Sequence, residues 1–271
     1  MAVTLIEYQQ ICYKLLCLYD DICKEKKYNY ILHYGTALGA VRHKGFIPWD
    51  DDVDVMMTYK DYKKLKKHFR KNNNVINGVS LDDHDFYPEN PHALPRLRYN
   101  NSRIYEVGTE GLDMNNGIWL DIFTYHYCAK NKKLENLQRF LIGIILMMNE
   151  KYRNRYKAHN GDILHQKILI YKIADKLPDL LRLITINLIK EAVGLLGSKK
   201  SGKYICDCNY VQKTRVIERK VLDHTTTCLF VDRAFNIPYD YDEYLTFCFG
   251  SNYMTPIKEH IHVNVDKAEI F

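Results

Sequence analysis

The sequence predicts an α+β protein: a mixed sheet core in the first half of the chain, flanking helices and a helical insertion. Short runs rich in β-branched and aromatic residues recur between residues 28 and 124 and are typical of strands. Residues 134–196 instead carry apolar side chains at helical spacing, and residues 201–271 return to short strands with one helix. The chain has 271 residues, 46% hydrophobic and 27% charged, which is enough to bury a globular core.

The chain begins with an expected amphipathic helix over Thr4–Lys27, because apolar residues recur there at helical spacing. A short strand rich in β-branched and aromatic residues is expected over Tyr28–His33. Gly35-Thr36 then opens a small helix that runs to Val41. A glycine and a proline mark Arg42–Trp49 as a loop.

A buried strand at Val53–Met57 and a lysine-rich surface helix at Tyr59–Lys71 follow this loop, and three asparagines end that helix. Further strands are expected at Val79–Leu81, Leu94–Tyr99, Ile104–Val107 and Trp119–Thr124. Long helices are expected at Leu134–Lys157 and Ile163–Leu196, the second with a bend at Pro178, and a shorter one at Tyr241–Cys248.

Lys and Arg outnumber Asp and Glu by 39 to 33, a net charge of +6. This mild, diffuse excess suits an anionic substrate or a membrane surface and is too weak to indicate nucleic-acid binding. The eight cysteines form no CxxC pair and no signal peptide precedes them, so we expect reduced thiols in a cytoplasmic protein. No apolar run reaches the roughly 18 residues that cross a bilayer. The apolar stretch Leu180–Leu196 is either a core helix or a segment that lies peripherally on the inner face of an anionic membrane.

Three consecutive aspartates at 50–52 are followed at once by Val53-Asp54-Val55. Alternate residues of a strand share a face, so Asp52 and Asp54 point the same way while the two valines point into the core. Two carboxylates this close repel each other unless a positive charge lies between them. A divalent cation, most often Mg²⁺ where phosphates are the other ligands, meets this need. Of Asp50 and Asp51, at least one is expected to cap or brace the loop.

Gly35-Thr36, the Asp52-x-Asp54 pair and Asp121 on its own strand resemble the nucleotidyltransferase superfamily. The polymerase-β-like core of that superfamily uses a small-residue pair, a DxD pair and a third strand carboxylate. Small residues at a helix start let backbone N–H groups approach a phosphate. Three carboxylates hold one or two cations that bridge phosphate oxygens during an in-line displacement.

A longer stretch, His33–Val55, resembles the signature of the LicD family, which includes fukutin-type proteins. Trp119–Phe123, read Trp-Leu-Asp-Ile-Phe, resembles the second block of that family, and Tyr244–His262 resembles a weakened third block. The family's usual Pro-Leu after the second block is Thr124-Tyr125 here, and its usual Tyr-Gly-Asp-Tyr is Phe-Gly-Ser-Asn-Tyr at 249–253. Both changes leave the carboxylates intact.

The resemblance implies transfer of phosphocholine from CDP-choline to a sugar hydroxyl of a cell-surface glycan precursor, such as teichoic acid or lipopolysaccharide. Asp52 and Asp54 would be ligands of Mg²⁺ or Mn²⁺, and Asp121 the third ligand or the base. The acceptor would be a glycan or a lipid-linked glycan. Residues 1–130 would form the nucleotidyltransferase-like catalytic core, 131–200 a helical region, and 201–271 an α+β segment that completes the core and its pocket.

Further residues are candidates for substrate binding. Basic and aromatic side chains near the aspartates suit a donor with phosphates, a cytosine and a quaternary ammonium group. Each candidate also has a purely structural explanation. Residues 42–44 would be a solvated basic loop, the two arginines of residues 94–99 would form ordinary ion pairs, and Trp49 would pack against its neighbours. The candidates are Gly35, Thr36, Arg42, Lys44, Trp49, Arg96, Arg98 and His262.

Two other functions are consistent with the sequence. One keeps the fold and changes the donor, giving a nucleotidyl or other phospho-group transferase that acts on sugars. The other is a catalytically inactive scaffold that binds a glycan or a membrane. The intact carboxylates at 52, 54 and 121 argue against the scaffold.

Overall fold

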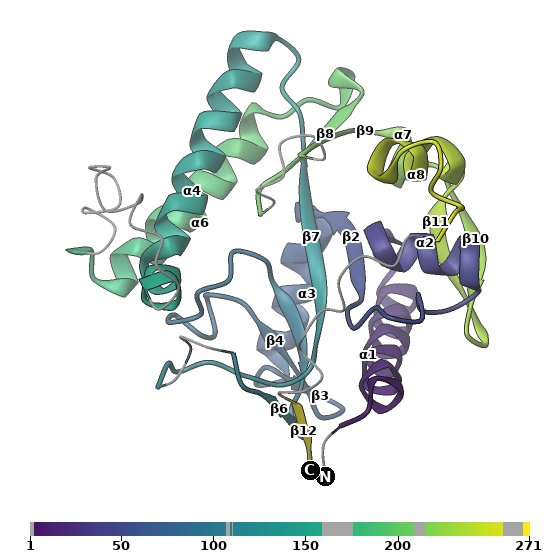
Figure 1. The fold of residues 1–271 in the computed structure, drawn as a ribbon. Coiled ribbons are helices and arrows are strands. Elements are labelled where there is room, and N and C mark those ends of the chain that lie inside the picture. The colour runs from purple at the N-terminus through teal and green to yellow at the C-terminus, as the bar shows by residue number, and fades with distance from the viewer. Residues whose placement is uncertain (1–2, 107–108, 110, 159–175, 209–214, 257–267) are drawn as a thin grey trace.

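A computed structural model describes residues 3–106, 109, 111–158, 176–208, 215–256 and 268–271 (Figure 1). In this part of the chain eight strands form the main sheet, whose path is β1-β2-β7-β5-β4-β3, with β8 beside β7 and β9 beside β8. The strands are β1 (Tyr30–Leu32), β2 (Asp54–Thr58), β3 (Val75–Ile76), β4 (Val79–Asp82), β5 (Arg96–Tyr99), β7 (Trp119–Tyr127), β8 (Lys203–Cys206) and β9 (Val216–Glu218). The sheet is mixed because β2 and β7 are parallel while the other described pairs are antiparallel.

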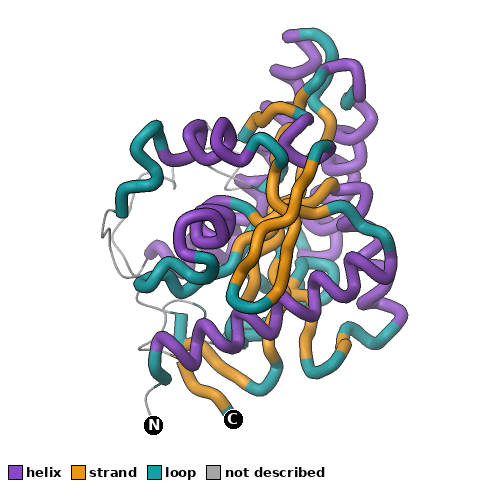
Figure 2. Tube along the Cα trace, turned by 90° about the vertical axis from the view of Figure 1, so that its right-hand side faces the viewer, coloured by secondary structure: helices purple, strands orange, loops and turns teal. Residues whose placement is uncertain are grey.

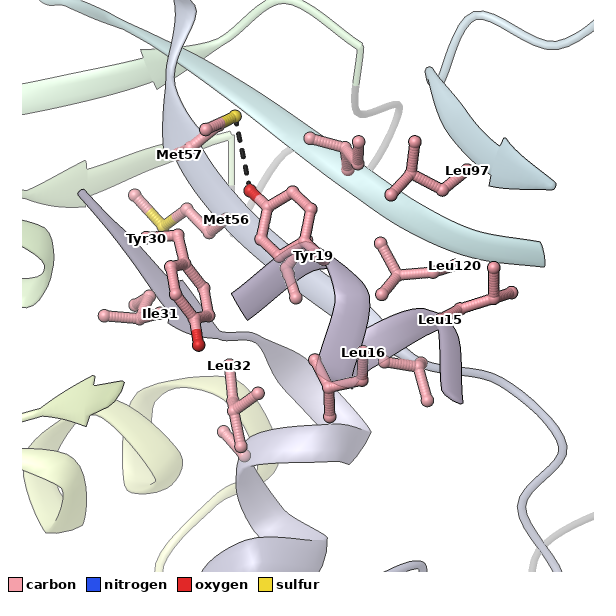
Figure 3. Close-up of a cluster of buried hydrophobic side chains, with 14 of the residues drawn as sticks. Leu15, Leu16, Tyr19, Tyr30, Ile31, Leu32, Met56, Met57, Leu97 and Leu120 are labelled. Atoms are coloured by element: carbon pink, nitrogen blue, oxygen red, sulfur yellow. Dashed lines mark hydrogen bonds between the residues drawn. The ribbon is translucent and has the colours of Figure 1, made fainter. Parts of the chain in front are cut away.

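Helix α1 (Leu5–Lys26) begins with a capping box, in which the Thr4 hydroxyl accepts the Glu7 N–H and the Glu7 carboxylate accepts the Thr4 N–H. Its apolar face packs against β5 and β7, with Leu15 near the Leu97 and Leu120 side chains in Figure 3. The helix therefore covers the face of the sheet that carries the apolar residues of these strands.

Helix α3 (Tyr59–Lys71) packs against the same face. The Tyr59 ring stacks on His126 of β7, with ring centroids 4.4 Å apart. His126 and Leu120 are six residues apart on one strand, so their side chains share a face. The lysines of α3 lie mostly on its outer side, as the sequence predicts for a basic surface helix.

Helices α2 (Tyr34–His43) and α8 (Tyr241–Phe249) contact each other, and α2 also contacts β1 and β2. His33, at the start of α2, lies against Phe123 and Tyr125 of β7, with ring centroids 4.8 and 5.9 Å away. These odd-numbered residues of β7 share the face opposite to that covered by α1. The beginning of α2 therefore lies over the second face of the sheet.

The hairpin of β10 and β11 contacts β1, α2 and α1. Figure 2 shows the hairpin of β10 and β11 on the side turned toward the viewer. A second small sheet pairs the last strand of the chain with a strand of the first half. These elements are β6 (Ser102–Ile104), η2 (Lys199–Ser201), α7 (Lys220–Asp223), β10 (Thr225–Phe230), β11 (Arg233–Pro238) and β12 (Ala268–Ile270).

Helices α4 (Lys132–Ala158) and α6 (Asp179–Leu196) pack against each other (Figure 1). A buried polar cluster joins this pair to the sheet. Asp207 accepts a hydrogen bond from the Thr124 hydroxyl, lies 3.2 Å from His126 Nε2 and lies 3.6 Å from Lys190 Nζ. Each member of the cluster is almost fully buried, so the Asp207 charge is balanced inside the protein.

The α+β class predicted from the sequence is confirmed, and most of the helices and strands for which the sequence predicts bounds lie within two residues of those bounds. The expected strand at Ile104–Val107 is shifted, because β12 pairs with Ser102–Ile104. Helix α6 begins at Asp179, directly after Pro178, so the proline marks a helix start and not a bend. Residues 163–175 of the expected second long helix lie outside the described part of the chain.

Helix α6 is only partly a core helix. It buries Ile186 and Val193, whereas Leu180, Leu188 and Leu195 are 70%, 65% and 86% exposed. Among the residues that the structure describes, no helix is both long and apolar enough to span a membrane.

Gly39 is required by the close packing of α2 against the loop that follows it. A Cβ atom at this position would lie 2.4 Å from the Gly45 carbonyl oxygen. We expect Gly39→Ala to lower the free energy of unfolding by about 1–3 kcal/mol despite the higher helix propensity of alanine. Chemical denaturation measures the change. Gly143→Ala in α4 is the matched control, because a Cβ there meets nothing within 4 Å, and equal effects of both substitutions would contradict the packing argument.

Candidate functional site

The parallel pairing of β2 with β7 places two carboxylates side by side. Asp54 lies directly opposite Asp121 in the register, and the Asp121 N–H donates to the Val53 carbonyl at 2.9 Å. Val53 and Val55 are fully buried on the other face. Partners across a strand pair have side chains on the same face, so Asp54 and Asp121 project together.

Alternation along the chain adds two more carboxylates to this pair. Asp50 and Asp52 precede Asp54 at steps of two residues, and their carboxyl groups are hydrogen-bonded to each other. Asp51 alternates with them, is 1% exposed and lies near Tyr8. The site is therefore a cluster of Asp50, Asp52, Asp54 and Asp121, which we call the carboxylate cluster.

The carboxylate cluster concentrates negative charge in a poorly solvated place. Burial, together with Asp52, Asp121 and Asp50, raises the pKa of Asp54 well above its usual range. Burial and the neighbouring Asp52 raise the pKa of Asp50 to about 8. Each ionised carboxylate disfavours the next, so the cluster gains stability from bound protons or from a cation.

The ligand chemistry of the carboxylate cluster fits a hard divalent cation. Carboxylate oxygens are the protein ligands that Mg²⁺ and Mn²⁺ prefer. In the described part of the chain, however, no three His, Cys, Asp or Glu side chains converge closely enough to form a ready-made metal site. Cation binding would thus require the mutually repelling carboxylates to turn toward one another.

Asp121 is held by two donors from its own sheet. Arg96 Nε donates to one carboxylate oxygen at 2.8 Å, and Trp119 Nε1 donates to the other at 3.1 Å. The Arg96 guanidinium also lies over the Trp119 ring, 4.2 Å from its centroid, and 3.6 Å from Glu106. Arg96 therefore positions Asp121 and is nearly buried in doing so.

Arg98 is fully buried and does not reach the surface of the site. It forms a 2.7 Å ion pair with Asp82 and donates to the Gly117 carbonyl. The expectation that Arg98 binds substrate is corrected by this burial, and the ion-pair alternative accounts for the residue. Its role is to support the strand beside Asp121.

The first turn of α2 lies against the carboxylate cluster. A Cβ on Gly35 would stand 2.9 Å from an Asp50 carboxylate oxygen, so glycine lets the Asp50 carboxylate approach the helix N-terminus closely. Thr36 is buried, and its hydroxyl accepts the Asp54 N–H at 2.8 Å. Thr36 therefore aligns the backbone at Asp54.

The remaining predicted residues lie around this helix. Arg42 is half-buried and donates to the Tyr253 carbonyl at 2.6 Å, which ties α2 to the C-terminal segment. Lys44 is exposed just after α2, and Trp49 is half-buried against the hydrophobic core with its ring near His43. His262 lies outside the described residues.

Two features of the site were not predicted from the sequence. Asp50 joins the carboxylate cluster, which the two-residue spacing of 50, 52 and 54 could have indicated. His33 is fully buried, and its Nδ1 is hydrogen-bonded to the Tyr244 hydroxyl, which also accepts the Tyr34 N–H. Residues 33 and 244 are too distant in the chain for a sequence pattern to pair them.

Comparison with known proteins confirms the resemblance over the part of the chain that holds this site. Residues 27–141 match the family described as LicD/FKTN/FKRP, nucleotidyltransferase domain. The lipopolysaccharide cholinephosphotransferase LicD of Haemophilus influenzae is 30% identical over 136 residues, which cover 49% of this chain and 48% of that protein. An uncharacterized protein of Rickettsia prowazekii is 25% identical and covers 34% of this chain and 48% of its own length. The chain spans about half the length of these curated relatives.

The buried His33 predicts a specific acid sensitivity. Burial lowers the pKa of His33 to about 3, below the unfolded value near 6.5, so its contribution to stability is complete above pH 6.5 and is lost as the pH falls. We expect the stability difference between the wild type and His33→Asn to shrink by about 2 kcal/mol from pH 7.5 to pH 5. Urea denaturation at both pH values measures it. A difference that stays constant would show that His33 is not buried as a neutral group.

Proposed function

We propose, from the LicD-family nucleotidyltransferase domain that this chain carries at residues 27–141, that the protein is a divalent-cation-dependent phosphocholine transferase. It moves phosphocholine from CDP-choline to a sugar hydroxyl of a cell-surface glycan precursor. The observation that carries the proposal is the pairing of Asp54 with Asp121 within a cluster of four carboxylates. The relative from Haemophilus influenzae, named as a lipopolysaccharide cholinephosphotransferase, supports lipopolysaccharide as the acceptor, with teichoic acid as the alternative.

The residues of the site have distinct parts in this proposal. Asp52, Asp54 and Asp121 hold Mg²⁺ or Mn²⁺, which when bound neutralises charge on the phosphates of the donor. The backbone at Gly35, in the first turn of α2, approaches a donor phosphate. The exposed Lys44, at the opposite end of this helix, adds positive charge at longer range. Arg96 and Trp119 keep the Asp121 carboxylate oriented. The fold we propose for this core is nucleotidyltransferase-like.

The proposed reaction is a displacement at phosphorus. The acceptor hydroxyl oxygen bonds to the phosphorus that bears choline, and the bond from that phosphorus to the bridging oxygen of CMP breaks. CMP leaves with the bonding electrons, and the hydroxyl proton passes to a carboxylate. Asp121 is either the third cation ligand or that base.

The segments of the chain have corresponding roles in the proposal. Residues 1–130 form the catalytic core, 131–200 a helical region, and 201–271 a segment that completes the core and its pocket. The pairing of β8 with β7 and the hydrogen bond between Tyr244 and His33 support the last assignment. The exposed leucines of α6 support a peripheral membrane contact, where a lipid-linked acceptor would reside.

Removing single carboxylates tests the proposal directly. We expect Asp54→Asn and Asp121→Asn each to lower the rate of CMP release from CDP-choline by at least about 100-fold, because each would remove a cation ligand. Asp113→Asn, at an exposed loop carboxylate, is the matched control and should retain full activity. EDTA should abolish activity and excess Mg²⁺ or Mn²⁺ should restore it. Near-wild-type turnover in either cluster variant would remove the metal-ligand assignment.

Donor identity is tested by ligand-induced stabilisation. With Mg²⁺ present, we expect CDP-choline to raise the melting temperature more than CDP-ribitol, CDP-glycerol or nucleoside triphosphates do, because only the specific donor binds the native state tightly. A larger shift with another donor would favour a different phospho-group transferase. A shift that is independent of Mg²⁺ and unaccompanied by turnover would favour an inactive binding scaffold.

A further inference from the structure

Two half-buried aromatic rings stand beside the carboxylate cluster on the same face of the sheet. Phe123 follows Asp121 by two residues on β7, so its side chain projects from the same face about 7 Å further along the strand. Tyr34 is the first residue of α2, directly before Gly35. The ring centroids of Tyr34 and Phe123 are 5.2 Å apart and the ring planes are inclined by 80°. The two rings thus form two walls of a corner.

Hydrogen bonding and ring packing hold the two rings of the corner in place. Tyr34 has a φ of 37°, which is uncommon for a residue other than glycine, and the Tyr244 hydroxyl accepts its N–H. The fully buried His33 ring packs against both rings, with centroids 3.9 Å from Tyr34 and 4.8 Å from Phe123. Because burial lowers the pKa of His33 to about 3, its imidazole is neutral near pH 7 and does not repel a cation in front of the corner.

The structure assigns the Tyr34–Phe123 corner as the subsite that binds a quaternary ammonium group attached to the donor phosphate. Aromatic faces attract such a cation, because water solvates it too weakly to compete with the rings. The separation of Phe123 from Asp121 along the strand is comparable with the extended length of a phosphocholine group. A phosphate at the carboxylate cluster would therefore place its choline against the two rings. This inference rests on the proposed function. It names Tyr34 and Phe123 as the residues that make the site selective for a choline-bearing donor.

An aromatic pocket near the first turn of α2 competes with the corner for this role. It has a volume of about 190 Å³ and lies between β9, α7 and α8, with Phe247 and one face of Tyr244 among its walls. Lys220 stands in its lining, paired with Glu243 at 2.5 Å. Tyr244 lines this pocket, and its hydroxyl accepts the Tyr34 N–H and is hydrogen-bonded to His33, so its side chain lies between the pocket and the first turn of α2.

Binding selectivity tests the assignment. We expect the wild type, with Mg²⁺ present, to bind CDP-choline about tenfold more tightly than CDP-ethanolamine, which presents a strongly hydrated primary ammonium. Phe123→Leu should reduce this ratio to about threefold or less, whereas Phe123→Tyr, which keeps a ring, should retain it. Phe247→Leu is the matched control from the competing pocket and should leave the ratio unchanged. Calorimetric titration measures binding, and thermal melting of each variant checks that it is folded.

Every outcome of this titration bears on the assignment. A wild type that binds neither donor, or binds both equally, overturns it, as does loss of selectivity in Phe247→Leu instead of Phe123→Leu. CMP release is measured in parallel. Selective binding that is lost in Phe123→Leu, without any turnover by the wild type, would sustain the subsite and contradict the proposed reaction, so the two failures are distinguishable.

Discussion

The parallel pairing of β2 with β7 is the constraint on which the site depends. It is the parallel pair among the described strands of the main sheet, and its register sets Asp54 against Asp121. A slip of one residue would turn Asp54 into the apolar layer and expose Val53 or Val55. Because α1 and α3 bury the valine face, the hydrophobic core fixes the register and the register assembles the carboxylates.

Gathering four carboxylates at one place opposes folding unless other charges compensate. Positive charges that compensate the carboxylates lie in a buried network. In it, Arg96 contacts Asp121, Arg98 contacts Asp82, and Glu106 lies near both arginines. Both guanidinium groups also lie over the Trp119 ring. These arginines have a structural role inside the protein. The negative charge that they do not neutralise at the carboxylate cluster is available to bind a cation or protons.

Residues beyond the matched domain contact the helix that lies beside the carboxylates. The family match ends at residue 141, yet Tyr244 of α8 holds the first turn of α2, and the Tyr253 carbonyl accepts a hydrogen bond from Arg42. The C-terminal region thus fixes the helix that lies beside the carboxylates. The pair α4 and α6 is joined to the back of the sheet through Asp207, away from the carboxylate face, and presents exposed leucines.

The sequence by itself determined the α+β class and the position of most helices and strands of the first half of the chain, and it singled out Asp52, Asp54 and Asp121 as candidates. These follow from local patterns: helical spacing in α1, alternation around Asp54, and the long stretch from His33 to Val55 that carries the family resemblance. Only the tertiary structure decided that Arg98 is a buried ion-pair partner, that Thr36 aligns Asp54, and that Tyr244 reaches His33. Those roles depend on burial and on contacts between residues up to 211 positions apart, and no local pattern encodes which distant side chain will satisfy a buried polar group.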